Sequence, residues 1–419
     1  MRSDYVEKKP EKDEKIKALT ASLLIDGTGA EPIKNGVVIV EGDKITQAGS
    51  GDEVRIPSDA YKIDLGAKTL MPGMIDAHAH IMGTRSYGAG ELIVPHDLLV
   101  LRGAEDCFKL LKAGFTTVRD CGSDIALSLK RAVIEGSIPG PRIFSAGRAL
   151  SQTAGHGDTH YLPRDEVIKR GTLLCDGPDD CRRAAREALR DGSDLIKVST
   201  TGGVGSEKDN PWEAQFTVEE IKAITYEAHN VGKRVASHAQ GALGIKNAII
   251  GGVDTIEHGY LLDDECVELM LKHGNYYVPT FALVEVYKRA LEKPYDMPPW
   301  RLRKQKLCME EMPKSLMKAY KAGVKIATGP DYFGAPLRAH GDNADELIAM
   351  AKYGMKPMDV LVAATKNGAE CIGIQETVGT LTEGKIADIV ALDGNPLQDM
   401  QATKRLTYVM KEGSTFLRV

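Results

Sequence analysis

Short apolar segments alternate with longer amphipathic segments through the middle of the chain. Apolar runs rich in β-branched residues predict buried strands, and the helical periodicity that follows each run predicts a helix. The predicted helices cover residues 123–135, 181–191, 218–231, 243–251, 266–273 and 314–322. The predicted strands end near His80, Asp120, Ala146, Val198, His238, His258, Thr280 and Gly329. Eight strands that alternate with helices predict an α/β fold in which a parallel sheet closes as a (β/α)8 barrel, a TIM barrel.

The two ends of the chain have a different pattern, in which short strands are separated by turns. Residues 36–45 predict a hairpin with a Gly-Asp turn, and further predicted strands cover residues 16–25, 386–392 and 407–410. Because both ends have this β character, they predict one small β-sandwich domain built from both chain ends. The predicted parts are a flexible tail (1–16), the small β domain (17–70 plus 375–419) and the barrel (71–374).

Composition and charge narrow the class of protein. The chain has 419 residues, of which 42% are hydrophobic, and this is ample for a large core. Its formal charge of −5 comes from 54 basic and 59 acidic residues spread along the chain, so neither nucleic acid nor a membrane is expected as a partner. No apolar run approaches the roughly 20 residues of a membrane span, and residues 1–17 contain no signal-peptide core. Seven cysteines without a CxxC pattern fit free thiols in a reducing, cytoplasmic location.

Histidines and an aspartate lie at the ends of several predicted strands. His78 and His80 are two residues apart, so in a strand they face the same side and can converge on a metal ion. His238 and His258 each close a later strand, and Asp331 follows the last one. Each residue alone also fits a simpler role, a core histidine or a turn aspartate. Because barrel active sites form at the carboxyl ends of strands, their joint occurrence there favours a metal site.

Lys197 lies in an apolar strand between Ile196 and Val198. One interpretation is that its side chain extends to solvent along the protein surface. The other is that it faces the barrel mouth, where an unpaired buried ammonium is costly. In its neutral form such an amine reacts with carbon dioxide to give a carbamate, which acts like a bidentate carboxylate and can bridge two divalent ions. The neighbouring candidate ligands favour this second interpretation.

These six residues and several sequence segments resemble those of the amidohydrolase superfamily. The resemblance covers nearly the whole chain beyond residue 17 and is carried by residues 72–80, 113–120 and 384–390. Residues 147–158 and 197–204 are similar to one branch of this superfamily. That branch contains metal-dependent Xaa-Pro dipeptidases, arginine carboxypeptidases and ochratoxin-hydrolysing amidases. Within that branch, the ochratoxin-hydrolysing group is matched by residues 209–211 and 214–216, and the arginine-releasing group by residues 340–343.

The resemblance implies a binuclear metal centre. His78 and His80 would bind the more buried divalent ion, and His238 and His258 would bind the more exposed one. The carbamate of Lys197 and a hydroxide would bridge the two ions. Two ions together lower the pKa of a bridging water and polarise the scissile carbonyl. Zinc suits histidine and carboxylate-type ligands, with cobalt and manganese as alternatives.

The resemblance also implies roles in proton transfer and charge stabilisation. Asp331 would ligate the buried ion, take the proton from the attacking hydroxide and give it to the leaving nitrogen. His156, in the loop after the third strand, is a catalytic candidate that would donate a hydrogen bond to the oxyanion. The alternative for His156 is a surface loop histidine. Lys197 is counted with these catalytic residues because its carbamate would hold both ions.

The implied reaction is hydrolysis of the amide bond of dipeptides or N-acyl L-amino acids by the metal-bridged hydroxide. Xaa-Pro, Xaa-Arg and ochratoxin-like compounds are the substrate types of the branch. A free α-carboxylate requires a cationic or polar partner in the loops after the strands. The substrate-binding candidates are Arg148, Arg338, His340 and Gln240, although either arginine can instead be structural. We expect a homo-oligomer that acts on a small-molecule substrate.

Two other functions remain open on the same fold. A cyclic amidohydrolase or deaminase, similar to imidazolonepropionase, would typically carry a glutamate three residues after His238, where this chain has Gly241. A non-catalytic barrel that serves as a scaffold would be expected to lose metal ligands, whereas all six ligand positions here hold ligand-type residues. Metal content separates the scaffold from both kinds of enzyme.

Overall fold

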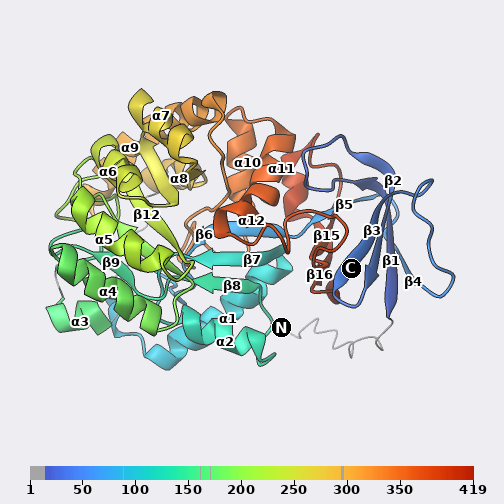
Figure 1. Cartoon of the computed structure of the whole chain (residues 1–419), viewed down its shortest axis with the longest axis horizontal. Helices are drawn as coiled ribbons and strands as arrows, with labels where there is room; N and C mark the ends of the chain where they lie inside the picture. Colours follow the sequence, from blue (N-terminus) through green and yellow to red (C-terminus); the bar gives the residue numbers. More distant parts are fainter. Residues whose placement is uncertain (1–14, 88, 161, 170, 294–296) are drawn as a thin grey trace.

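The computed structural model describes residues 15–87, 89–160, 162–169, 171–293 and 297–419. The predicted tail, residues 1–16, therefore lies almost wholly outside the described residues. Figure 1 shows the strands of both chain ends, in blue and red, side by side at one end of the molecule. Parallel strands covered by helices form the larger part, so the predicted α/β class is confirmed. Within the described ranges, no helix is both long and apolar enough to cross a bilayer.

Strands from both ends of the chain form one sheet. Its order is β17-β16-β15-β5-β1-β2-β3, with β4 paired to β1. The strands are β1 (Ile16–Leu24), β2 (Ile33–Glu41), β3 (Lys44–Ser50), β4 (Tyr61–Asp64), β5 (Lys68–Pro72), β15 (Ile389–Asp393), β16 (Leu406–Lys411) and β17 (Ser414–Arg418). Strand β15 pairs antiparallel with β5, so the last strands of the chain join the first ones directly. Leu19, Val38 and Tyr408 share one core cluster, and hydrogen bonds unite the strands of the predicted sandwich into one continuous sheet.

Two parallel sheets form the larger part of the fold. The first contains β6 (Met74–Ala79), β7 (Phe115–Asp120) and β8 (Arg142–Ser145). The second has the order β10-β9-β11-β12-β13-β14, with β9 (Ala149–Ser151), β10 (Thr172–Leu174), β11 (Leu195–Ser199), β12 (Arg234–Gly241), β13 (Thr255–Leu261) and β14 (Tyr276–Val278). The register aligns Ser199 with His238 and Ala239 with His258, so the carboxyl ends of these strands lie at one edge.

The segment predicted as the eighth strand connects the two parallel sheets. Tyr277 donates its N–H to Lys325 O (2.9 Å), and Ala77 donates its N–H to Thr328 O (2.8 Å). The segment nevertheless forms only isolated bridges, so the prediction of a full strand was wrong. A longer ladder would need further N–H donors, and Pro330 has none. These hydrogen bonds link the segment to β14 on one side and to β6 on the other, which is the neighbour order that a closed barrel requires.

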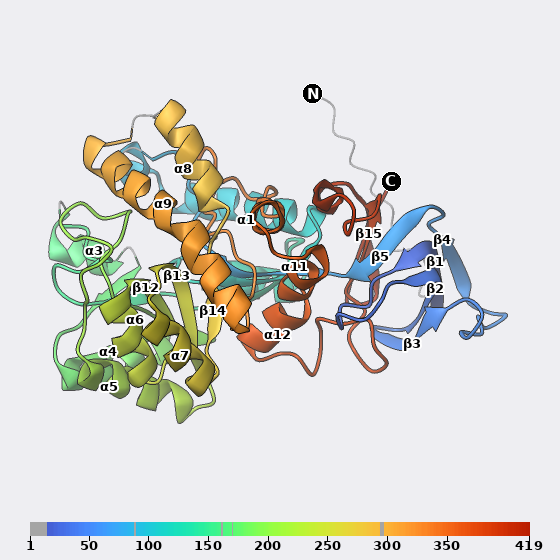
Figure 2. The same cartoon turned by 90° about the horizontal axis from the view of Figure 1, so that it is seen from above.

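Helices follow the strands of the parallel sheets in the predicted alternation. They are the 3-10 helix η1 (Ala89–Ile93), α1 (His96–Lys112), α2 (Ala126–Ile134), α3 (Arg164–Lys169), α4 (Pro178–Arg190), α5 (Val218–His229), α6 (Ala242–Ile250), α7 (Asp264–His273), α8 (Leu283–Glu292), α9 (Pro299–Ala322), α10 (Asp345–Lys352), α11 (Pro357–Ala363), α12 (Lys366–Ile372) and the 3-10 helix η2 (Met400–Lys404). The helix predicted at 314–322 is only the last part of α9, because this helix continues through Pro313. Figure 2 shows α9 beside α8, and α9 also packs on β13.

A buried ion pair crosses the interior between the two parallel sheets. Arg119 on β7 is 2% exposed and Glu257 on β13 is 0% exposed, and Arg119 Nη2 lies 2.7 Å from Glu257 Oε1. Arg119 also donates to Ala77 O on β6 (2.5 Å) and to Thr255 Oγ1 on β13 (3.1 Å). One guanidinium therefore links strands of both sheets. Each charge needs the other, because an unpaired charge at this depth would be costly.

Replacing Arg119 by methionine should destabilise the fold, because Glu257 would remain as an unpaired buried charge. We expect the free energy of unfolding to fall by about 3–5 kcal/mol, measured by urea unfolding followed by circular dichroism. The matched control is Arg131→Met, which removes an ion pair with Glu135 on an exposed helix face and should leave the unfolding midpoint unchanged. A wild-type midpoint for Arg119→Met would contradict a stabilising role of the buried pair.

Candidate active site

His78 at the end of β6 and His80 just after it meet Asp331 at the carboxyl edge of the parallel strands. His80 Nε2 lies 3.3 Å from Asp331 Oδ1, and His78 Nε2 lies 3.7 Å from the same oxygen. The donor atoms of all three residues lie within 4.8 Å of one another, as the ligands of one metal ion must. Asp331 has a φ of 59°, which is uncommon for a non-glycine residue, and its N–H is donated to His78 O (2.9 Å). Although burial opposes ionisation, contact with His80 holds the pKa of Asp331 well below its usual range.

Protein partners anchor the outer nitrogen of three of the histidines. Nδ1 of His78 bonds to Glu257 Oε2 (2.7 Å), and Nδ1 of His80 bonds to a backbone carbonyl (2.8 Å). On β13, Nδ1 of His258 bonds to Thr280 Oγ1 (2.9 Å). These bonds leave Nε2 of each ring for another partner. Metal-binding histidines are oriented in this way, because a bond to the second nitrogen fixes both the tautomer and the ring.

The imidazole rings form a continuous group. His156 stacks on His238, with ring centroids 4.0 Å apart and an interplanar angle of 18°. The His258 ring lies 4.5 Å from that of His238 and 4.9 Å from that of His78. His238 Nε2 bonds to Gly202 O (3.2 Å), which leaves Nδ1 of this ring for another partner. The structure therefore brings all four predicted histidine ligands together, with His156 beside them.

Lys197 lies on β11, which pairs with β12, and its ammonium has no hydrogen-bond partner among the described residues. The residue is 4% exposed, and Nζ is buried without a partner in the described part of the chain. Burial lowers the pKa of His78, His238 and His258 well below the usual value, and the charge of Lys197 adds to each shift. His78 Nε2 is also buried and has no hydrogen bond to a residue that the structure describes. Buried polar atoms normally have hydrogen-bond partners. These two nitrogens without partners therefore fit a site that is completed by divalent metal and a carbamate on the lysine.

A second group of possible ligands fits a metal less well. The donor atoms of His78, Cys121 and Glu257 also lie within 4.8 Å of one another. However, burial raises the pKa of the Cys121 thiol to about 12, and metals bind the thiolate. Glu257 is already paired with Arg119. The group formed by the histidines of β6 and Asp331 is therefore the better candidate.

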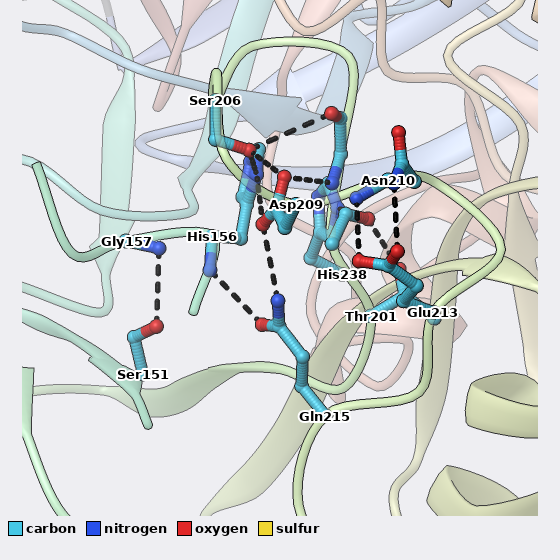
Figure 3. A network of polar contacts seen from close by, with 12 residues as sticks. Ser151, His156, Gly157, Thr201, Ser206, Asp209, Asn210, Glu213, Gln215 and His238 are labelled. Atoms are coloured by element: carbon cyan, nitrogen blue, oxygen red, sulfur yellow. Dashed lines mark hydrogen bonds and ion pairs between the residues drawn. The ribbon is translucent and has the colours of Figure 1, made fainter. Parts of the chain in front are cut away.

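A polar network on one loop holds His156 against His238 (Figure 3). Ser206 Oγ lies 2.8 Å from His156 Nδ1, and Gln215 Oε1 accepts the backbone N–H of His156 (2.9 Å). Gly203 backs both rings, since a Cβ there would lie 2.3 Å from His156 Cε1 and 3.0 Å from His238 Nε2. Only glycine permits this close approach of loop and rings. Nδ1 of His156 is thus engaged, and Nε2 is left for a ligand.

Lys304 on α9 supports the same loop. Its ammonium, which has three N–H donors, lies within hydrogen-bonding distance of four backbone carbonyls, those of Gly203 (3.2 Å), Ser206 (2.6 Å), Glu207 (3.4 Å) and Asp209. Lys304 is 8% exposed, so the cation is largely removed from water. A single side chain therefore satisfies several carbonyls that a partly buried loop would otherwise leave without donors.

Two of the predicted substrate-binding residues lie next to the candidate ligands. Arg338 Nη1 is 3.3 Å from Asp331 Oδ2, and the side chain of Arg338 is 6% exposed. His340 Nε2 lies 3.1 Å from His80 O, and its Nδ1 is buried without a hydrogen bond to any described residue. Arg338 is therefore the cation that the structure brings to the site.

The other two predicted substrate-binding residues, Gln240 and Arg148, differ in whether their side chains already have partners. Gln240 is buried on β12, and its Oε1 has no hydrogen-bond partner among the residues described. Arg148 instead pairs with Glu187 of α4 (2.8 Å) and with Asp191 at the end of that helix. These carboxylates neutralise its charge, so the contacts of Arg148 favour the structural alternative, and Arg148 is not brought to the histidines.

Several residues that shape the site were missed by sequence analysis. Glu257 holds His78, and Arg119 pairs with Glu257. Both are charged residues within otherwise buried strand segments, and this signal could have identified them, because such charges need partners. Asp76 accepts the N–H of His78 (2.9 Å) and could have been found in the same way. Lys304 lies in a helix rich in lysine and arginine, where nothing in the sequence distinguishes it.

Comparisons with known proteins agree with this geometry. The model of the amidohydrolase family matches residues 69–416. The ochratoxinase of Aspergillus niger is 36% identical over 428 residues, which cover 96% of this chain and 87% of that protein. A crystal structure of a Xaa-Pro dipeptidase with bound methionine in the active site has a TM-score of 0.88 and 32% identity, covering 96% of this chain and 100% of the other. A prolidase complexed with N-methylphosphonate-L-proline has a TM-score of 0.89 and 32% identity, with coverage of 96% and 100%.

Replacing Lys197 by alanine should lower the metal content of the protein. We expect about two divalent ions per chain in wild-type protein purified with zinc and bicarbonate, and about one or none in Lys197→Ala, as measured by elemental analysis. A small carboxylic acid should partly restore the metal content, because it can replace the carbamate. The control Lys222→Ala, at an exposed position of α5, should retain both ions. Only traces of metal in the wild-type protein would contradict the assignment.

Proposed function

Because the chain belongs to the amidohydrolase family and is a hydrolase of amide bonds, we propose that it uses two divalent metal ions to release an L-amino acid with a free α-carboxylate. The proposed substrates are dipeptides or N-acyl L-amino acids, of the Xaa-Pro, Xaa-Arg or ochratoxin-like type. Relatives named ochratoxinase, Xaa-Pro dipeptidase and prolidase support this class. The observation that carries the proposal is the convergence of His78, His80 and Asp331, together with the buried Nζ of Lys197, which has no hydrogen-bond partner among the described residues.

The proposed centre divides its ligands between the strands. His78 on β6, His80 directly after that strand and Asp331 would hold one ion, and His238 of β12 and His258 of β13 would hold the other. The amine of Lys197 would form a C–N bond to carbon dioxide and release a proton to solvent, and the resulting carbamate would help to hold the ions. When bound, the ions, for which zinc is the best match to these ligands, supply Lewis acidity toward water and the scissile carbonyl.

Two residues have the position that proton transfer and charge stabilisation require. Asp331 takes a proton from the attacking water and passes it to the leaving nitrogen. Its Oδ1 faces His78 and His80, and its Oδ2 faces Arg338, so the carboxylate lies between the two candidate ligands and the arginine. His156 donates through Nε2 to the developing oxyanion, since Ser206 engages its Nδ1.

Arg338 is the proposed partner of the substrate carboxylate. It is a largely buried cation beside Asp331, and its Nε has no hydrogen bond to any residue that the structure describes. Gln240 and His340 are proposed as further polar contacts, because each has a buried side-chain atom without a partner there. Arg148 is not retained in this role, since the carboxylates beside α4 already neutralise it.

The proposal extends to the architecture that carries the site. Residues 71–374 would close a (β/α)8 barrel, and residues 17–70 plus 375–419 would form a small β-sandwich domain. The bonds that link β14 to β6 support closure of the barrel, and the core shared by strands of both chain ends supports the sandwich. A homo-oligomer also stays a prediction of the sequence.

Asp331→Asn should abolish turnover while leaving the fold intact. The amide retains the size of the side chain but cannot carry a proton, so kcat should fall by about 10²–10⁴-fold with an unchanged circular dichroism spectrum. The control Asp264→Asn alters an exposed carboxylate on α7 that pairs with Lys318 and should leave kcat unchanged. If Asp331→Asn stays within about tenfold of wild type, another group is the base.

Blocking the substrate carboxylate should depress hydrolysis. A pocket that holds a buried cation for this charge is left with an unpaired group when the carboxylate becomes an ester or an amide. We expect kcat/KM of methyl esters and carboxamides to be about 100-fold lower than that of the free acids, measured on a panel of dipeptides and N-acyl amino acids. Equal rates would refute the assignment. Faster turnover of nucleobases or cyclic imides would favour the cyclic amidohydrolase or deaminase instead.

A further inference from the structure

A second arginine lies near Arg338, on the first turn of α9. Arg301 has a buried Nε without a hydrogen-bond partner, as Arg338 does, and in the described part of the chain it forms no ion pair with a carboxylate. Burial lowers the pKa of Arg301, and the charge of Arg338 adds to this shift. Asp331 contacts Arg338, and no carboxylate of the described residues pairs with Arg301, so the two arginines carry an excess positive charge that favours binding of an anion.

Aromatic rings connect and orient the two guanidiniums. Arg301 Cζ lies 5.2 Å from the centre of the Tyr87 ring, and Arg338 Cζ lies 5.1 Å from that of Phe333. The Tyr87 and Phe333 rings contact each other edge to face at 5.8 Å, and Arg338 also lies 5.9 Å from the centre of the Tyr287 ring. Rings that cover the faces of a guanidinium leave its N–H edge for hydrogen bonds, the arrangement in which arginine binds carboxylates.

The charges around this pair do not balance. Asp331 is the one carboxylate that contacts Arg338 within the described ranges, and its other oxygen faces His78 and His80. A carboxylate shared with candidate metal ligands cannot also neutralise both arginines. Burial of the excess positive charge is unfavourable until an anion enters.

The position of the pair indicates which carboxylate it would bind. In the proposed function, Asp331 delivers a proton to the leaving nitrogen, and the α-carboxylate of the released amino acid is only two bonds from that nitrogen. An anion held beside Arg338 would therefore belong to the leaving group and not to the acyl group. We propose that Arg301 and Arg338 together form the subsite for the free α-carboxylate of the leaving amino acid, with Arg301 as a specificity-determining residue.

This inference rests on the proposed function for the identity of the anion, and Arg301→Met tests it. The substrate pairs are Ala-Pro with Ala-Pro-amide, and N-benzoyl-L-phenylalanine with its carboxamide. For whichever free acid the zinc-loaded wild type hydrolyses, kcat/KM should fall by about 10- to 100-fold, mainly through KM. Hydrolysis of the carboxamide should change by no more than about twofold. Arg301→Lys should restore part of the loss, because it keeps the charge but not the planar fork.

The control is Arg303→Met, an exposed arginine on the same helix, which should leave both substrates within about twofold of wild type. Equal losses for acid and carboxamide in Arg301→Met, or no loss for either, would overturn the inference and leave the proposed function intact.

A binding measurement distinguishes failure of the subsite from failure of the proposed function. Calorimetry with L-proline, L-phenylalanine and L-arginine should detect binding to wild-type protein, and their amides should bind more weakly. Arg301→Met should remove that preference. If no panel compound is hydrolysed but the preference for the acids is found, the proposed function fails and the anion subsite stands. Equal binding of acids and amides, or no binding of the acids, would overturn the subsite.

Discussion

The buried pair of Arg119 and Glu257 is the constraint on which the rest of the site depends. Glu257 uses one oxygen for Arg119 and the other for Nδ1 of His78, so a single carboxylate links the strand framework to a candidate ligand. Its ionised form is tolerable at 0% exposure only with a cation in contact. Arg119 in turn donates to Ala77 O, one residue before His78. Both the backbone and the ring of this histidine are therefore fixed by the same charge pair, and Nε2 is directed to Asp331 as a result.

Much of this arrangement could be predicted from sequence, because it depends on strand ends. Alternating apolar and amphipathic segments predict parallel strands, and parallel strands bring their carboxyl ends to one edge. His78 and His80 share a face by their spacing alone, and His238 and His258 lie on adjacent, aligned strands. The β domain formed by both chain ends was predicted from the strand patterns of residues 16–25, 36–45, 386–392 and 407–410. The structure adds β5, which pairs directly with β15 and so joins the two ends.

The parts that could not be predicted depend on partners distant in sequence. Arg148 and Arg338 are both arginines in loops after strands, and only the fold shows that one meets two carboxylates while the other meets Asp331. Prolines lie at two places where the structure departs from the predicted elements. The helix predicted at 314–322 is part of α9, which continues through Pro313, and the segment predicted as the eighth strand is followed by Pro330, which has no N–H donor for a longer ladder.

Helix α9 contacts both the loop beside His156 and the aromatic rings beside Arg338. Arg301 and Lys304 are three residues apart and so are neighbours on one helix surface. Lys304 holds the loop whose Ser206 engages His156, and Arg301 faces the ring of Tyr87 on the side of Arg338. A displacement of this helix would therefore disturb the proposed oxyanion donor and the proposed carboxylate subsite together. Because Lys304 bonds to backbone carbonyls, its support of the loop does not depend on most of the loop side chains. Substitution of those side chains would therefore leave the contact between α9 and the loop in place.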